Sequence, residues 1–259
     1  MTEGVSNTDG APIRIGGVDI DRARARSAAA QYLAAQGHRF GYPAYDAFDA
    51  GSGPFRVGDG DQLTPVLLNV PVSVKTFYSL TDVRGKLDAW LKKVPPDARL
   101  IDAGTDELDL LGELFAVLDG GQRRPHLSGA VLAKVMHRKR PAFVPLYDRH
   151  VDHCYRGAPG APITKDVKRP WREFMPLLGL AMIQDLRREA DYLAEVVLMA
   201  TNPVITTLRA LDIVAWQAGR SSGPKPGLWS NDVPDEFEET EDSSDTADAV
   251  VLADLDDSV

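Results

Sequence analysis

A basic segment with a central carboxylate is the part of the chain best suited to chemistry. In residues 121–156, eight Lys and Arg side chains stand against two acidic ones, Asp148 and Asp152. The whole chain carries a net charge of −9, so the overall average hides this local excess. Cations contact phosphates, and a carboxylate can act in catalysis, so a nucleic acid is the first partner to consider.

The turn that leads into the next helical pattern fits phosphate binding. Gly129 follows Ser128 there, and glycine lets the backbone approach a phosphate closely. The amides at a helix start, with the positive end of the helix dipole behind them, would hold that phosphate. Further contacts to DNA are expected from basic side chains along and after this helix: Lys134, His137, Arg138, Lys139, Arg140, Arg149 and His150. Alternatively, the basic residues before Pro141 form a solvated helix end that suits the dipole.

Two motifs carry a resemblance to a known superfamily. Residues 127–136 read L-S-G-A-V-L-A-K-V-M, and residues 147–151 read Y-D-R-H-V. Together they resemble the helix-hairpin-helix and the following helix of the base-excision DNA glycosylases. The resemblance implies that the turn at Leu127, Ser128 and Gly129 holds a DNA phosphate through its amides, and that Asp148 is catalytic. The chain is also similar to an uncharacterised bacterial family, a domain of unknown function with a similar H-R-K-R-P and Y-D core.

Asp148 has two interpretations. The resemblance implies a DNA N-glycosylase, in which one carboxylate stabilises an oxocarbenium-like sugar or activates water after the base is flipped out. Alternatively, Asp148 is the N-cap of a helix over 149–156, because Asp is preferred at that position. The two roles are compatible. The chain departs from the superfamily at Val131, where the hairpin has a second glycine, and at Ala133, where some members carry a Schiff-base lysine.

A metal site is the weaker interpretation of the residues that follow. His150, His153 and Cys154 have a spacing that places ligands on one helix face. The same spacing puts Cys154 on an apolar stripe with Tyr147 and Val151, which favours a packed thiol. We therefore expect no metal site and no cofactor.

The acidity of the chain comes from its last residues. Residues 231–259 hold twelve Asp and Glu and no Lys or Arg, so without them 29 basic side chains stand against 26 acidic ones, a net of +3. Residues 220–234 read as a linker rich in Gly, Pro and Ser, and residues 235–259 as a disordered acidic tail. Two roles for such a tail are open: an inert, solubilising extension, or a polyanion that contacts the basic face, within one molecule or between two, and competes there with DNA.

Helical signals dominate the rest of the chain. We expect a flexible stretch over 1–15 and an all-α domain over 16–219, with the helix-hairpin-helix region at about 108–156. Only 72–77 reads as extended, because Val, Thr and an aromatic residue cluster there. The expected helices cover 20–36, 42–50, 62–70, 79–93, 106–118, 149–156, 170–185, 186–200 and 203–219.

The sequence also gives an expectation for localisation. No signal peptide and no apolar stretch of about 20 residues is visible, which indicates a cytoplasmic protein without a membrane span.

Three functional hypotheses follow from these features. The first is a divergent glycosylase-like protein that uses Asp148. The second is a module that binds the DNA backbone without catalysis. The third is a helical scaffold that binds another protein.

Overall fold

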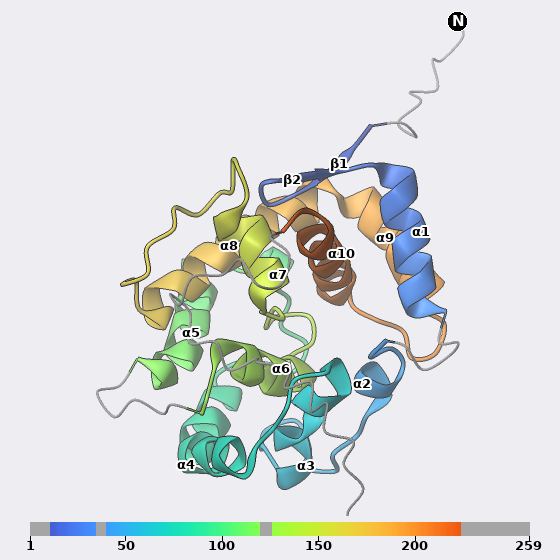
Figure 1. Ribbon diagram of the computed structural model, residues 1–259. Helices are drawn as coiled ribbons and strands as arrows, with labels where there is room; N and C mark the ends of the chain where they lie inside the picture. The colour runs from blue at the N-terminus through green and yellow to red at the C-terminus, as the bar shows by residue number, and fades with distance from the viewer. Residues whose placement is uncertain (1–10, 35–39, 120–125, 224–259) are drawn as a thin grey trace, which may run out of the picture. The chain divides into compact units, whose positions relative to one another are not determined.

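The computed structural model describes residues 11–34, 40–119 and 126–223 (Figure 1). The predictions for residues 1–10, for Arg123 and Arg124, for the linker from residue 224 and for the acidic tail lie outside the described residues. Within them, ten α-helices and one two-stranded sheet confirm the all-α prediction. No helix in these ranges is long and apolar enough to cross a bilayer.

The described residues begin with an antiparallel hairpin that the sequence patterns did not predict. Strand β1 (Ile13–Ile15) pairs with β2 (Val18–Ile20), and the side chains of Ile13 and Ile15 are buried. The amide of Gly16 in the turn donates to Oδ2 of Asp185 at 2.7 Å. Residues 13–15 are thus ordered by contacts with distant residues, which corrects the expectation of a flexible stretch up to residue 15.

Helices α1 (Arg22–Leu33), α9 (Ala190–Met199) and α10 (Thr207–Ser222) form the part of the core next to the hairpin. Helix α1 packs against α9 and α10, as Figure 1 shows. Helix α10 was expected to begin at Pro203. It begins at Thr207 instead, because the hydroxyl of Thr206 accepts the amide of Arg209 at 3.1 Å and so supplies the cap.

Most of the segment expected to be extended over 72–77 is helical, since residues 74–77 belong to α4 (Val74–Leu91). The cap of this helix is Ser73, whose hydroxyl accepts the amide of Thr76 at 3.1 Å. The predicted apolar stripe of this helix, which includes Leu80 and Leu87, is buried as expected. The cap and the stripe together outweigh the strand preference of the residues at 74–77. Short helices precede it: α2 (Ala44–Ala47), α3 (Asp59–Gln62) and the 3-10 helix η1 (Thr64–Leu68).

Two longer helices form a closely packed pair. Helix α5 (Thr105–Phe115), extended by η3 (Ala116–Leu118), lies against α8 (Trp171–Arg188). Pro176 lies inside α8 without ending it, and the helix stops at Glu189, where α9 follows. The short 3-10 helix η2 (Leu100–Asp102) also contacts α8.

The basic segment forms the remaining elements. Helix α6 (Gly129–Lys139) contacts α3 and η1, and α7 (Arg149–Asp152) continues directly into the π-helical turn η4 (His153–Gly157). Helix α7 packs against α10, where Gly219 allows close approach: a Cβ atom there would lie 2.0 Å from the carbonyl oxygen of His150. Helices α6 and α7 therefore hold the two motifs of the basic segment against the core.

Candidate functional site

The start of α6 is a packed cap. The hydroxyl of Ser128 accepts the amide of Val131 at 3.3 Å, so one of the free amides of the helix start is already satisfied. Gly129 is buried, and a Cβ atom on it would lie 2.1 Å from the ring of Trp171. The indole thus occupies the space beside Gly129. Glycine is required here for packing against Trp171, and Val131 needs no unusual backbone because it is part of the helix.

Three residues expected to contact DNA are interior. Lys134, His137 and Arg140 are 3%, 1% and 0% exposed. Arg140 donates to four backbone carbonyls: those of Val94 at 2.8 Å, Leu91 at 2.6 Å, Pro54 at 2.8 Å and its own neighbour Lys139 at 2.7 Å. Four of the five N–H donors of this guanidinium thus bind carbonyls, and the residue is 0% exposed, so it does not present a cation to a phosphate. The placement corrects the expectation of DNA contacts for these three residues.

The other two cations of α6 are occupied as well. Arg138 donates to the carbonyl of Asp46 at 3.0 Å and to that of Phe48. Lys139 forms an ion pair of 2.8 Å with Asp61, and its side chain is only 7% exposed. The basic run therefore serves mainly to hold the segment 46–61 against α6, and it is neither a free phosphate-binding surface nor the solvated helix end considered as the alternative.

Asp148 caps α7, as expected. Its Oδ1 accepts the amides of His150 at 2.9 Å and Val151 at 3.1 Å. Its Oδ2 faces the side-chain nitrogen of Lys134 at 4.0 Å, and 26% of the Asp148 side chain is exposed. The fold therefore joins a fixed, partly accessible carboxylate to a buried amine from the preceding helix.

The amine of Lys134 is sparsely satisfied. Among the described residues it makes one hydrogen bond, to the carbonyl of Tyr147 at 3.5 Å, which is close to the limit for such a bond. Burial lowers the pKa of Lys134, and the nearby Asp148 carboxylate partly opposes that shift. This brings the amine closer to its neutral, nucleophilic form than an exposed lysine would be.

A second carboxylate, which the sequence patterns did not single out, lies beneath this pair. Asp212 of α10 is 1% exposed, its Oδ2 accepts the amide of Leu146 at 3.4 Å, and its Oδ1 has no hydrogen-bond partner among the described residues. Burial raises the pKa of Asp212 well above its ordinary value, and the Arg209 guanidinium partly offsets this. Its Oδ2 also lies 3.8 Å from Nδ1 of His137.

The same cluster contains a buried ion pair. Arg209 binds both carboxylate oxygens of Asp46, at 2.8 and 3.3 Å, and donates to the hydroxyl of Tyr32 at 3.0 Å. Burial, with the Arg209 charge next, lowers the pKa of His137 to about 3, so this imidazole is neutral at ordinary pH. Its Nδ1 lies 2.7 Å from the carbonyl of Val144, which fixes the ring. No local sequence signal joins Asp46 to α10, because the two are 163 residues apart.

Two residues of the basic segment do reach the surface near Asp148. Arg149 is exposed, and His150 is half-buried with its ring edge-on to Trp216 at 5.9 Å between centroids. Burial lowers the pKa of His150, and the Asp148 carboxylate partly counteracts it. Of the side chains expected to contact DNA, these two flank the partly exposed carboxylate.

The thiol and the histidines do not form a metal site within the described residues. No group of three or more His, Cys, Asp or Glu side chains could hold an ion there. Cys154 is fully buried, donates to the carbonyl of Ala215 at 3.3 Å, and has its pKa raised to about 12, chiefly by burial. It packs beside Val151, as the apolar stripe predicted.

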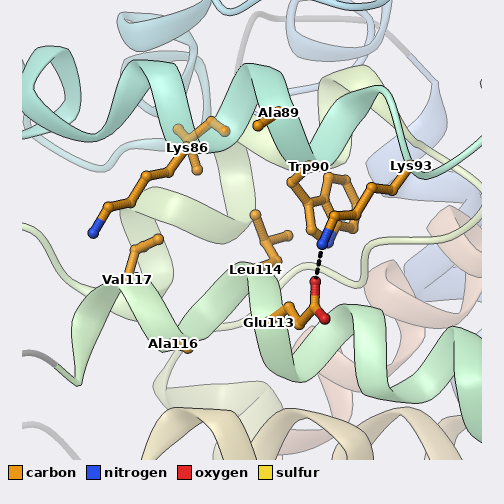
Figure 2. Close-up of a pocket in the computed structure, with 9 residues that line it drawn as sticks. Lys86, Ala89, Trp90, Lys93, Glu113, Leu114, Ala116 and Val117 are labelled. Carbon is orange, nitrogen blue, oxygen red and sulfur yellow. Dashed lines mark hydrogen bonds and ion pairs between the residues drawn. The ribbon is translucent and has the colours of Figure 1, made fainter.

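A groove lies apart from Asp148, between α4 and the end of α5 with η3. It encloses about 300 Å³ and is lined chiefly by apolar groups, including Trp90 and Leu114. Figure 2 shows Lys93 and Glu113 joined across it by an ion pair of 2.6 Å. Lys86 points from α4 toward the opposite end of the groove. The groove contains no carboxylate other than Glu113, and the described residues place no nucleophile in it.

Comparison with known proteins gives one match. The family described as "Family of unknown function (DUF6308)" covers residues 25–219, which include every element from α1 onward that surrounds Asp148. No curated protein matches the chain, and no solved structure matches it.

Proposed function

Because the chain belongs to the DUF6308 family, whose function is unknown, we propose a function from the site itself: a DNA-binding protein related to the helix-hairpin-helix glycosylases, with Asp148 as its reactive carboxylate. The observation that carries this proposal is the approach of Lys134 to Asp148, 4.0 Å apart at the start of α7. The motif resemblance concerns the same helix start and the helix before it.

The geometry of Asp148 suits electrostatic catalysis on a flipped nucleotide. Two backbone amides fix Oδ1, so the carboxylate needs no reorganisation when positive charge develops on a sugar. The oxygen Oδ2 lies 4.0 Å from Nζ of Lys134, and 26% of the Asp148 side chain is exposed. A carboxylate in this position would stabilise an oxocarbenium-like sugar or orient water toward it.

The test separates binding from chemistry. Fluorescence anisotropy is measured with an intact duplex and with a duplex that carries an abasic-site analogue, and base release is assayed on duplexes with damaged bases. Asp148→Asn keeps an N-cap side chain, so the fold should persist while base release is lost and DNA binding remains. Asp82→Asn is the matched control, because Asp82 is an exposed carboxylate of α4.

The outcomes discriminate the hypotheses. Preference for the abasic duplex, with turnover that only Asp148→Asn abolishes, supports the glycosylase-like function. Salt-dependent binding of both duplexes without base release reduces the function to a backbone-binding module. Failure of the full chain to bind either duplex at low salt rejects the proposal.

A second candidate function is a helical scaffold for another protein. The observation that favours it is a set of exposed apolar side chains between α3 and the first turns of α4: Leu63, Val66, Val74 and Tyr78, which are 49%, 52%, 71% and 63% exposed. Binding of a protein partner would depend weakly on salt, whereas phosphate contacts release counterions and depend strongly on it.

A further inference from the structure

A group of cations without carboxylate partners lies in a segment that the sequence motifs did not include. Residues 164–172, which lead from the segment after η4 into the first turn of α8, contain Lys165, Lys168, Arg169 and Arg172 with one acid, Asp166. We call these four cations the basic loop. Lys165, Lys168 and Arg172 are exposed, and Arg169 is half-buried.

The cations of the basic loop differ from those of α6 in their ion pairing. Arg169 donates to the carbonyl of Thr164 at 3.0 Å, and in the described ranges no ion pair within 4.0 Å involves any of the four side chains. In α6, by contrast, Lys139 is paired with Asp61 and Lys134 with Asp148. Charges without a protein counterion attract mobile ions, and a phosphate that displaces those ions gains affinity.

The basic loop is anchored at both ends. At its start, Ile163 is buried and its amide donates to the carbonyl of Tyr155 at 3.0 Å. At its end, the amides of Trp171 and Arg172 donate to the two carboxylate oxygens of Asp119, at 2.7 and 2.8 Å. The loop therefore presents its cations from a fixed backbone, which lowers the ordering cost of binding.

The anchor residue Trp171 also contacts the residue that precedes Asp148. The indole lies edge-on to the ring of Tyr147, with centroids 5.2 Å apart, and it fills the space next to Gly129. Tyr147 directly precedes Asp148 in the chain. The Trp171 side chain thus connects the basic loop with Gly129 at the start of α6 and with Tyr147, the residue before Asp148.

We propose that Lys165, Lys168, Arg169 and Arg172 form the surface that contacts the phosphates of duplex DNA, in place of the basic run of α6. This inference rests on the proposed DNA-binding function and names the surface that would perform it. Such contacts position the duplex and carry no sequence information.

The experiment compares two quadruple variants of the full chain. The loop variant carries Lys165→Gln, Lys168→Gln, Arg169→Gln and Arg172→Gln. The control variant carries Lys75→Gln, Lys92→Gln, Arg24→Gln and Arg56→Gln, which removes the same number of charges of each type from exposed positions elsewhere. Thermal unfolding confirms that each variant is folded. Anisotropy with a labelled duplex then gives the dissociation constant over a series of salt concentrations.

The loop variant should bind at least about tenfold more weakly at low salt, and its salt dependence should flatten by about 0.9 logarithmic units for each phosphate that is no longer neutralised. The control variant should keep the slope of the unchanged protein. An equal weakening in both variants, or unchanged binding by the loop variant, would overturn the inference while leaving DNA binding intact. Absence of DNA binding by the unchanged chain would overturn the proposed function and the inference together.

Discussion

The side-chain nitrogen of Lys134 lies 4.0 Å from Oδ2 of Asp148. Within this polar pair, Lys134 is the buried residue and Asp148 is the one that reaches the surface. Lys134 is 3% exposed, while 26% of the Asp148 side chain reaches solvent. The ammonium of Lys134 is therefore desolvated, and its partners in the described residues, Asp148 at 4.0 Å and the carbonyl of Tyr147 at 3.5 Å, are both distant. The carboxylate of Asp148 is held in place but stays partly open to solvent. Such an arrangement costs stability, because burial of an ammonium is weakly compensated here.

Lys134→Met should show that cost directly. The thioether fills a similar space without a charge, so the free energy of unfolding should stay level or rise by about 1 kcal/mol. Urea denaturation measures this change. If the proposed chemistry uses the pair, base release should fall in the same variant. A decrease of more than about 2 kcal/mol would mean that the ammonium supports the fold.

Replacing Arg140 should have the opposite effect on stability. Arg140→Ala leaves two buried carbonyls, those of Leu91 and Val94, without their donor, and it also removes the bond to the carbonyl of Pro54. Each buried unsatisfied group costs about 1–3 kcal/mol, so the total decrease should reach at least about 2 kcal/mol. The control is Arg149→Ala, an exposed arginine whose replacement should change stability by less than about 0.5 kcal/mol. Similar melting curves for the two variants would contradict the structural role of Arg140.

Gly129 and Gly85 form a matched pair for testing the Trp171 contact. In Gly129→Ala the new methyl group meets the indole at 2.1 Å, and overpacking of this kind costs about 1–3 kcal/mol. Gly85, in α4, has no atom within 4 Å of an added Cβ, so Gly85→Ala should stabilise the protein by up to about 1 kcal/mol. Chemical denaturation distinguishes the two. Trp171→Leu should relieve the penalty in a double variant, and a penalty that persists there would show that the clash has another source.

The buried imidazole of His137 predicts a decrease of stability in mild acid. In the unfolded chain a histidine binds a proton near pH 6.5, whereas folding lowers the pKa of His137 to about 3. The unfolded state therefore holds more protons between these values, and the free energy of unfolding falls as pH falls through this window. The full slope is about 1.4 kcal/mol per pH unit for one proton.

His137→Asn removes this titration and keeps an amide donor near Nδ1. Denaturation curves at pH 7, 6, 5 and 4 should show that the stability advantage of the unchanged protein shrinks with each step. Asp212 lies 3.8 Å from His137 and its pKa is raised by burial, so the same curves are also recorded with Asp212→Asn in both proteins to remove its titration. A difference that is independent of pH would refute the assignment of His137 as the group that titrates.

The acidic end of the chain gives a prediction about charge. Truncation after residue 230 changes the formal net charge from −9 to +3, because twelve acids and no bases are removed. The shorter chain should bind duplex DNA more tightly at about 0.01 M salt, where the screening length is about 30 Å. The advantage should diminish at about 0.15 M, where that length is about 8 Å. Equal affinities of the two chains at low salt would rule out an inhibitory role for residues 231–259.

Local patterns were sufficient for much of the fold. The apolar stripe of α4, the Asp148 cap of α7 and the packed thiol of Cys154 were all predicted and are confirmed. Each depends on neighbours within a few residues, which is the range over which periodicity and capping act. The start of α4 was predicted too late, because the cap at Ser73 overrides the strand preference of the next residues.

The role of a charged residue, in contrast, was decided by partners far away in the chain. The type and spacing of Lys139 and Arg140 are the same whether they face DNA or the core. Their partners, Asp61 and the carbonyl of Leu91, lie in segments that only the fold brings to α6. Likewise Asp212, on a helix more than sixty residues after Asp148, joins the cluster through packing of α10 against α7. The sequence by itself determined the helices and the carboxylate at the start of α7. Only the tertiary structure decided which charges are buried, because burial and pairing arise from long-range contacts that local spacing does not encode.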